Sequence, residues 1–201
     1  MGDLTAADLM AAYGISMEEE PGADYRGVMV VAEASPDGVA PAALAALGVG
    51  REMADALGAR LEALLVGAGE AQAQELVARG ADVVLLAGEE SAYQLAPWAE
   101  AVAAAIQARK PEVVLWGGSD LAYDLAPRVA QRLETGLICN VAQVRTEAED
   151  RLAVGIVPMY GGKLVGEYYC PQRRPQMLCL GAGVGRAPSA DRSRQGEIER
   201  L

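Results

Sequence analysis

The sequence predicts an α/β fold of three layers, in which a mostly parallel sheet carries helices on both faces and continues into an antiparallel extension. Two observations lead to this prediction. Up to residue 140, short apolar runs alternate with stretches of helical pattern, which is typical of βαβ units with right-handed crossovers. After residue 140 the helical pattern stops, and strand-like runs follow one another with short turns between them, which requires antiparallel pairing.

The parallel part of the sheet is predicted from continuous apolar runs, because a parallel strand is usually covered on both faces. Strands are expected at 27–33, 61–66, 83–87 and 113–116. Helices are expected between them at 41–57, at 71–79 and from Pro97 to just before Pro111. Pro41 suits the first position of its helix, and Gly58 and Gly80 suit helix ends.

The stretch from Val113 to Asn140 indicates a buried strand, a Gly-Gly-Ser turn, a helix and a further strand. Gly117-Gly118-Ser119 allows the backbone to turn sharply and to approach a neighbour or a ligand closely. We expect Asp124 to cap the helix and Pro127 to lie in its first turn. Gly136 is expected to end the helix, with the next strand directly after it.

The remaining strands and the domain boundaries follow from the same patterns. Strands are expected at 141–145, 152–157, 164–169 and 176–180. The chain is divided into an N-terminal arm at 1–26, an α/β domain at 27–180 and a C-terminal linker or tail at 181–201, which lacks apolar periodicity. The apolar residues of the arm could pack on a partner or on the domain itself, or the arm could fray.

The composition excludes several classes of function. A net charge of −11 and an aromatic content of 4% argue against nucleic acid, which is bound by cations and stacking rings. There is no histidine, the commonest general base and metal ligand, and the three cysteines lack the Cys-x-x-Cys spacing of metal sites. No apolar run approaches the roughly 20 residues of a membrane helix, and no signal-peptide pattern is present, so we expect a cytoplasmic protein without membrane insertion.

Three motifs give the chain a resemblance to a known family. They are Asp124-Leu125-Ala126-Pro127-Arg128 with Ala130, Arg132-Leu133 and Thr135-Gly136-Leu137 after it, then Tyr160-Gly161-Gly162, then Arg174-Pro175-Gln176-Met177. In this order and spacing, the sequence resembles the N-terminal domain of the electron transfer flavoprotein alpha subunit over about residues 27 to 180. The resemblance implies an adenine-nucleotide alpha-hydrolase-like fold and a scaffold or docking domain in a flavin-based electron transfer complex, rather than a catalyst by itself.

The same resemblance implies cofactors and partners. FAD would belong to the complex but would not be held by this chain alone, because the family's FAD-binding C-terminal domain is absent from a sequence that stops at Leu201. AMP would bind mainly on a partner subunit. The expected partners are an electron transfer flavoprotein beta-like subunit in a heterodimer, a flavin dehydrogenase and, where one exists, a separate chain that carries the FAD domain.

Two turns are candidate cofactor-binding sites, and each has a purely structural alternative. Gly117, Gly118 and Ser119 end a central strand ahead of a helix, where backbone N–H groups suit a phosphate, or they form a tight turn only. Tyr160, Gly161 and Gly162 either face a flavin domain or beta subunit, or form a hairpin turn with Tyr160 packed on the sheet. We expect no catalytic residue and no metal site, and Trp98 and Trp116 should pack in the core.

A second function stays open at this point: a stand-alone nucleotide-binding domain for AMP or ATP, or a sensing domain. It would use residues 117–119 together with the loop after the first strand, at 34–38, since ligands of open α/β sheets bind at such strand-to-helix loops. Whether the isolated chain carries a nucleotide would discriminate between the two functions.

Overall fold

The computed structural model describes residue 22, residues 24–88 and residues 91–201. The predicted N-terminal arm at 1–26 therefore lies almost wholly outside the described residues.

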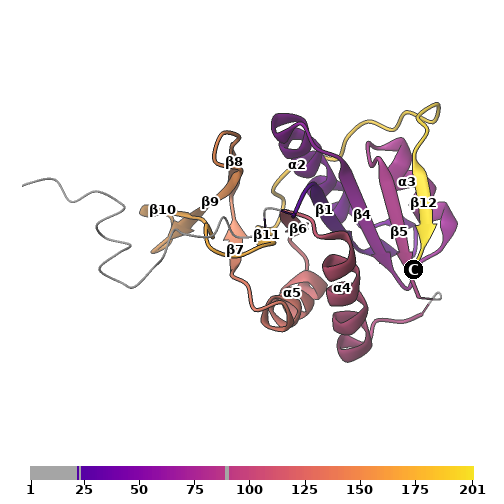
Figure 1. Ribbon diagram of the computed structural model, residues 1–201, viewed down its shortest axis with the longest axis horizontal. Coiled ribbons are helices and arrows are strands. Elements are labelled where there is room, and N and C mark those ends of the chain that lie inside the picture. Colours follow the sequence, from indigo (N-terminus) through magenta and orange to yellow (C-terminus); the bar gives the residue numbers. More distant parts are fainter. Residues whose placement is uncertain (1–21, 23, 89–90) are drawn as a thin grey trace, which may run out of the picture.

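A seven-stranded sheet forms the middle layer of the fold (Figure 1). Its strands lie in the order β12-β5-β4-β1-β6-β11-β7, and every neighbouring pair is parallel. The strands are β1 (Val28–Ala32), β4 (Leu61–Val66), β5 (Val83–Ala87), β6 (Val113–Trp116), β7 (Leu137–Val141), β11 (Gln176–Leu180) and β12 (Glu197–Arg200). We call it the main sheet; it confirms the predicted parallel α/β fold.

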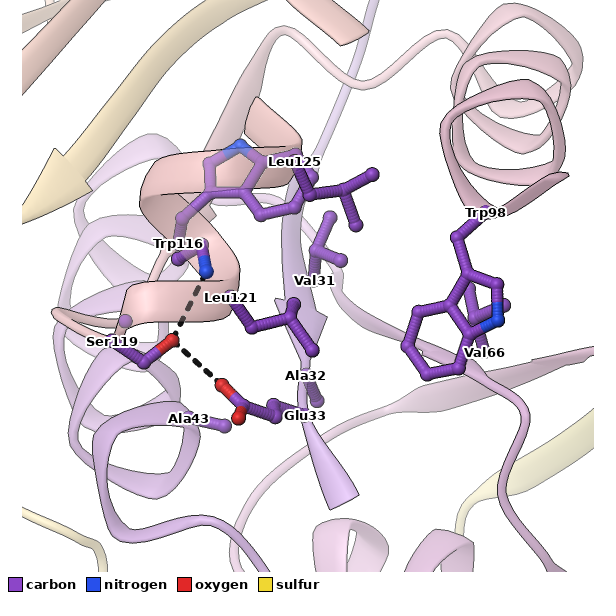
Figure 2. A pocket seen from close by; sticks show the side chains of 12 residues that line it. Val31, Ala32, Glu33, Ala43, Val66, Trp98, Trp116, Ser119, Leu121 and Leu125 are labelled. Atoms are coloured by element: carbon purple, nitrogen blue, oxygen red, sulfur yellow. Dashed lines mark hydrogen bonds between the residues drawn. The ribbon is translucent and has the colours of Figure 1, made fainter. Parts of the chain in front are cut away.

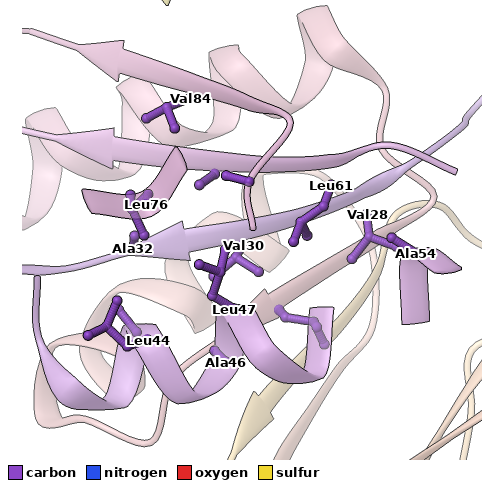
Figure 3. Packing of buried hydrophobic residues seen from close by; sticks show 14 of the residues in the cluster. Val28, Val30, Ala32, Leu44, Ala46, Leu47, Ala54, Leu61, Leu76 and Val84 are labelled. Atoms are coloured by element: carbon purple, nitrogen blue, oxygen red, sulfur yellow. The ribbon is translucent and has the colours of Figure 1, made fainter. Parts of the chain in front are cut away.

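Helices cover both faces of the main sheet and separate its core into two apolar clusters. The helices α2 (Pro41–Leu57) and α3 (Glu70–Ala78) pack on one face, and α4 (Leu95–Arg109) and α5 (Asp120–Arg132) pack on the other. Strand β1 serves both clusters, since Val28, Val30 and Ala32 face α2 while Met29 and Val31 face the opposite side. Figure 3 shows the first cluster, where Leu44 and Leu47 of α2 lie toward the side chains of β1.

Most predicted elements of the first half are confirmed, but the start of α5 differs from the prediction. The helix begins at Asp120, and its N-cap is Ser119, whose Oγ accepts a hydrogen bond from the Ala122 backbone N–H at 3.1 Å. Asp124 is therefore not a cap, and Pro127 lies inside the helix rather than in its first turn. Ser119 has an extended backbone and a short side chain with an oxygen atom, which are the properties that an N-cap position favours. The residue predicted as part of the turn is therefore also the cap of the helix.

The end of α5 also differs from the prediction. The helix stops at Arg132, and the left-handed conformation is adopted by Glu134, at φ 51°, rather than by Gly136. Gly136 instead allows a close approach, because a Cβ there would lie 2.5 Å from the Cys170 sulfur.

The C-terminal segment at 181–201 was expected to be a linker or tail, and its end corrects that expectation. Strand β12 pairs with β5 in parallel, from Glu197 opposite Val83 to Arg200 opposite Leu86, and so forms one edge of the main sheet. Its sequence shows no apolar periodicity because an edge strand is held largely by backbone hydrogen bonds. Ile198 alone packs on the core, while Glu197 and Glu199 form ion pairs.

A second, three-stranded sheet stands out from the main sheet at its opposite end (Figure 1). Its strands are β8 (Gln143–Glu147), β9 (Leu152–Met159) and β10 (Leu164–Tyr168), in the order β10-β9-β8. Both pairings are antiparallel, as predicted from the short turns. We call it the antiparallel sheet. The antiparallel extension was expected to span residues 141–180, but its last strand, 176–180, instead forms β11, which lies between β6 and β7 in the main sheet and is parallel to both. A small hairpin of β2 (Ala34–Ser35) and β3 (Gly38–Val39) follows β1, and no helix of the described residues is long and apolar enough to cross a membrane.

Candidate functional site

The predicted Gly-Gly-Ser turn lies at a switch point of the main sheet, between β1 and β6. These strands are neighbours, but the chain leaves β1 for α2 on one face and leaves β6 for α5 on the other. Ligands of open α/β sheets bind at such a crevice. The cavity here is lined by Glu33 after β1, by Gly117 and Ser119 after β6, and by apolar side chains that include Trp98 and Trp116 (Figure 2).

A carboxylate of the chain itself occupies the polar end of this cavity. Ser119 Oγ donates a hydrogen bond to Glu33 Oε2 at 2.6 Å, while the same oxygen accepts from the Ala122 backbone N–H (Figure 2). Glu33 thus places its negative charge at the start of α5, where a helix N-terminus favours an anion. The remaining cavity has a volume of about 10 Å³, about one water molecule, whereas small-molecule sites span about 300–1,000 Å³.

Both glycines of the turn lie directly against backbone. A Cβ at Gly117 would be 2.5 Å from the carbonyl oxygen of Ala42 in α2. A Cβ at Gly118 would be 2.5 Å from the carbonyl carbon and oxygen of Gly181, directly after β11. The turn therefore joins α2, β6 and β11 at contact distances that only glycine allows, which gives both residues a structural reason independent of any ligand.

The second predicted turn lies in the antiparallel sheet and shares no part of this cavity. Tyr160, Gly161 and Gly162 connect β9 to β10, with φ values of 52°, 68° and 82°. The prediction that Tyr160 packs on the sheet is wrong, since 76% of its surface is exposed. The reason is that Met159 and Leu164 form the last pair of the ladder, so Tyr160 lies beyond the sheet.

An exposed apolar surface that the sequence pattern did not predict lies beside this turn. Large apolar side chains are exposed along β10 and at its two ends, and we call them the β10 patch: Tyr160, Leu164, Val165, Tyr168 and Tyr169. Strand β10 is an edge of the antiparallel sheet. The available signal was the pairing of neighbours, Leu164-Val165 and Tyr168-Tyr169, because consecutive apolar residues must point to both faces of a strand.

The tryptophans pack in the core as predicted, and the ring of Trp98 contacts Tyr93, a tyrosine with a raised pKa. Tyr93 packs edge-on against Trp98 with ring centroids 5.2 Å apart, and its hydroxyl donates a hydrogen bond to Asp124 Oδ2 at 2.8 Å. Burial, and then this hydrogen bond to a carboxylate, raise the pKa of Tyr93 to about 12. Asp124 was expected to be a helix cap, but its hydrogen bond with Tyr93 instead connects α5 to the segment before α4.

We predict that the Tyr93 phenol titrates near pH 12 and that Asp124→Asn lowers its pKa, because the change removes the charge and keeps the burial. The pKa of Tyr93 is higher in the folded state than in the unfolded state, where it is near 10. The hydrogen bond therefore contributes its full stability below pH 10, and this contribution is lost as the pH rises through about 12. The measurement is an ultraviolet titration compared with that of Tyr93→Phe. A phenol at Tyr93 that ionises near 10 in the native chain would contradict this prediction.

The described residues hold no group of three or more His, Cys, Asp or Glu side chains suited to a metal ion. Cys139, Cys170 and Cys179 are free thiols.

Comparison with known proteins identifies relatives along nearly the whole described domain. The electron transfer flavoprotein domain family matches residues 28–201. FixB of Clostridium saccharobutylicum is 35% identical over 164 residues, which cover 81% of this chain and 49% of that protein. Electron transfer flavoprotein subunit alpha is 36% identical over 165 residues in Clostridium acetobutylicum, covering 81% and 49%, and 33% identical over 179 residues in Megasphaera elsdenii, covering 88% and 53%. The chain spans about half the length of these curated relatives.

Proposed function

The chain belongs to the electron transfer flavoprotein family, and on this premise we propose that it is an alpha-type docking domain in a flavin-based electron transfer complex. Its part in the complex is to hold partner chains in place rather than to carry a reacting group. The names of its relatives, alpha subunit and FixB, support the alpha-type role.

The observation that carries the docking role is the β10 patch. A soluble protein rarely leaves neighbouring aromatic and aliphatic side chains exposed on an edge strand, because such an edge promotes aggregation. Along β10, Leu164, Val165 and Tyr168 are all exposed. An electron transfer flavoprotein beta-like subunit that buries this strand would remove the exposed apolar area, and the free backbone groups of the edge could pair with it.

FAD, in this proposal, is held by partner chains, and AMP lies mainly on the beta-like subunit. The support is the closed switch point, because Glu33 occupies its polar end and the cavity of about 10 Å³ leaves room only for a water molecule. The alternative of a stand-alone AMP- or ATP-binding or sensing domain has less support for the same reason, since a carboxylate repels a phosphate at close range.

The test is a visible absorption spectrum of the material that the tagged chain captures from its own cells, with the captured chains identified by mass spectrometry. We expect a flavin spectrum together with a beta-like subunit, and no flavin on the chain purified alone. Val165→Lys should abolish both signals, because it places a charge within the β10 patch. Ala104→Lys, at an exposed site on α4, is the matched control and should leave them unchanged.

Two results would count against the docking role. One is a captured sample without flavin and without a beta-like subunit. The other is AMP or ATP released in stoichiometric amount from the denatured chain alone, which would favour the stand-alone nucleotide-binding function.

A further inference from the structure

Polar side chains buried in the described part of the chain gather at the junction of its two sheets. Glu112 is 2% exposed and Gln176 is 0% exposed. Glu112 directly precedes β6, and Gln176 is the first residue of β11, where it lies opposite Val113. Both therefore lie at the same end of the main sheet, beside the start of β9. Since a buried polar group is unfavourable unless it is paired, its partners show what it holds.

Gln176 bonds the start of β9 through both atoms of its amide. Its Oε1 accepts from the Ala153 backbone N–H at 3.0 Å, and its Nε2 donates to the Arg151 carbonyl at 3.0 Å. The Gln176 side chain thus forms the two hydrogen bonds that a neighbouring strand would otherwise form with the backbone at the start of β9. Without it, the Ala153 N–H would lose this partner, and the Arg151 carbonyl would keep only the longer hydrogen bond that Arg174 Nη2 donates to it at 3.5 Å.

Glu112 fixes the same segment through its side chain. Arg151 donates to the Glu112 carboxylate from Nε at 2.7 Å and from Nη2 at 2.5 Å. The Gly27 backbone N–H also donates to Glu112, at 3.2 Å, so the carboxylate ties the residue before β1 to the residue before β9. Arg151 has a φ of 51°, an uncommon conformation for a residue with a side chain, and the bonds on both sides of it hold it there.

The apolar contacts at this junction are non-directional. Ala153 and Val154 are buried, and Gly155 lies against Ile138, where a Cβ would approach the side chain to 3.0 Å. Such contacts bring two surfaces together without fixing their angle. The hydrogen bonds of Gln176 do fix it, because they require one position of β9 relative to β11.

We propose that Gln176 is a positioning residue that holds the antiparallel sheet, and with it the β10 patch, at one fixed angle to the main sheet. Its importance for partner binding rests on the docking role proposed above, whereas the fixed angle is a property of this chain alone. A preformed docking surface loses less conformational entropy when a partner binds than a mobile one does. The motif Arg174-Pro175-Gln176-Met177 thereby acquires a role that involves no cofactor.

The test is hydrogen–deuterium exchange of the isolated chain, read separately for β8–β10 and for β1, β4 and β5. Gln176→Met keeps most of the side-chain volume and removes both hydrogen bonds. We expect exchange in β8–β10 to become about 10- to 100-fold faster while the central strands stay unchanged, because two hydrogen bonds are lost at the junction only. Gln143→Met, at an exposed site on β8, is the matched control and should change neither region.

A uniform acceleration in all strands, or no acceleration in β8–β10, would overturn the proposal. If Gln176→Met does not fold, the unmodified chain still decides the question, since the Ala153 amide should exchange as slowly as the amides of β1, and exchange as fast as at the β9–β10 turn contradicts a fixed junction. Capture of the flavin-containing complex is then compared between Gln176→Met and Gln143→Met. Local loosening without any loss of captured complex would leave the positioning role intact and count against the docking role alone.

Discussion

Replacing Gly118 with alanine should destabilise this domain by at least about 3 kcal/mol, at the upper end of what overpacking costs in protein cores. The added Cβ would lie 2.5 Å from the carbonyl carbon and oxygen of Gly181 and 2.7 Å from the backbone nitrogen of Ala182. These are backbone atoms that follow a central strand, and they cannot move aside as the end of a flexible side chain does. The midpoint of urea unfolding measures the effect.

Gly161 provides the control for Gly118→Ala. A Cβ there meets no atom within 4 Å, so the only cost is its left-handed conformation at φ 68°. Asparagine tolerates that conformation better than most residues, and Gly161→Asn should cost no more than about 1 kcal/mol. A Gly118→Ala chain that unfolds at the urea concentration of the unmodified chain would show that the contact with Gly181 relaxes easily, and would reopen the turn as a site kept for a ligand.

The main sheet could be predicted from the sequence because its central strands are buried on both faces. The apolar run from Val113 to Trp116 is short and lies between Pro111 and Gly117, which favours a buried strand over a buried helix. Pro41 and Gly58 mark the ends of α2 by their backbone preferences. Strand β12 lacked this signal, because an edge strand that pairs through its backbone can consist mostly of charged residues. A pattern of apolar residues indicates which side chains are buried, whereas β12 is held mainly by backbone hydrogen bonds to β5. Such a strand leaves no apolar pattern in the sequence.

The candidate site was predictable in position but not in content. The βαβ pattern places 117–119 between a buried strand and a helix, whereas the strand order and the occupation of the switch point by Glu33 depend on segments far apart in the chain. The same holds for Gln176, whose partners are the backbone groups of Arg151 and Ala153. Backbone groups carry no sequence signal, so the role of such a side chain emerges only once the strands are placed.

Breaking the buried ion pair at the same junction should have the other large effect. In Arg151→Met, the Glu112 carboxylate, which is 2% exposed in the unmodified chain, would lose both hydrogen bonds from the guanidinium. Removing one partner of a buried pair costs about 3–5 kcal/mol, because the remaining charge is left without compensation. Water can enter where the Arg151 side chain was, since that side chain is 33% exposed, so we expect about 3 kcal/mol in urea unfolding, the low end of that range.

The double variant separates the stability lost with the ion pair from the stability lost with the other contacts of the Arg151 side chain. Glu112→Gln removes the charge and keeps an acceptor for the Gly27 N–H, so adding it to Arg151→Met should restore at least half of the lost stability. The two changes would then couple by more than about 1 kcal/mol, as contacting residues do. Additive effects would mean that Glu112 is well solvated without Arg151, and the junction would then depend on Gln176 and the apolar contacts of β9 rather than on charge.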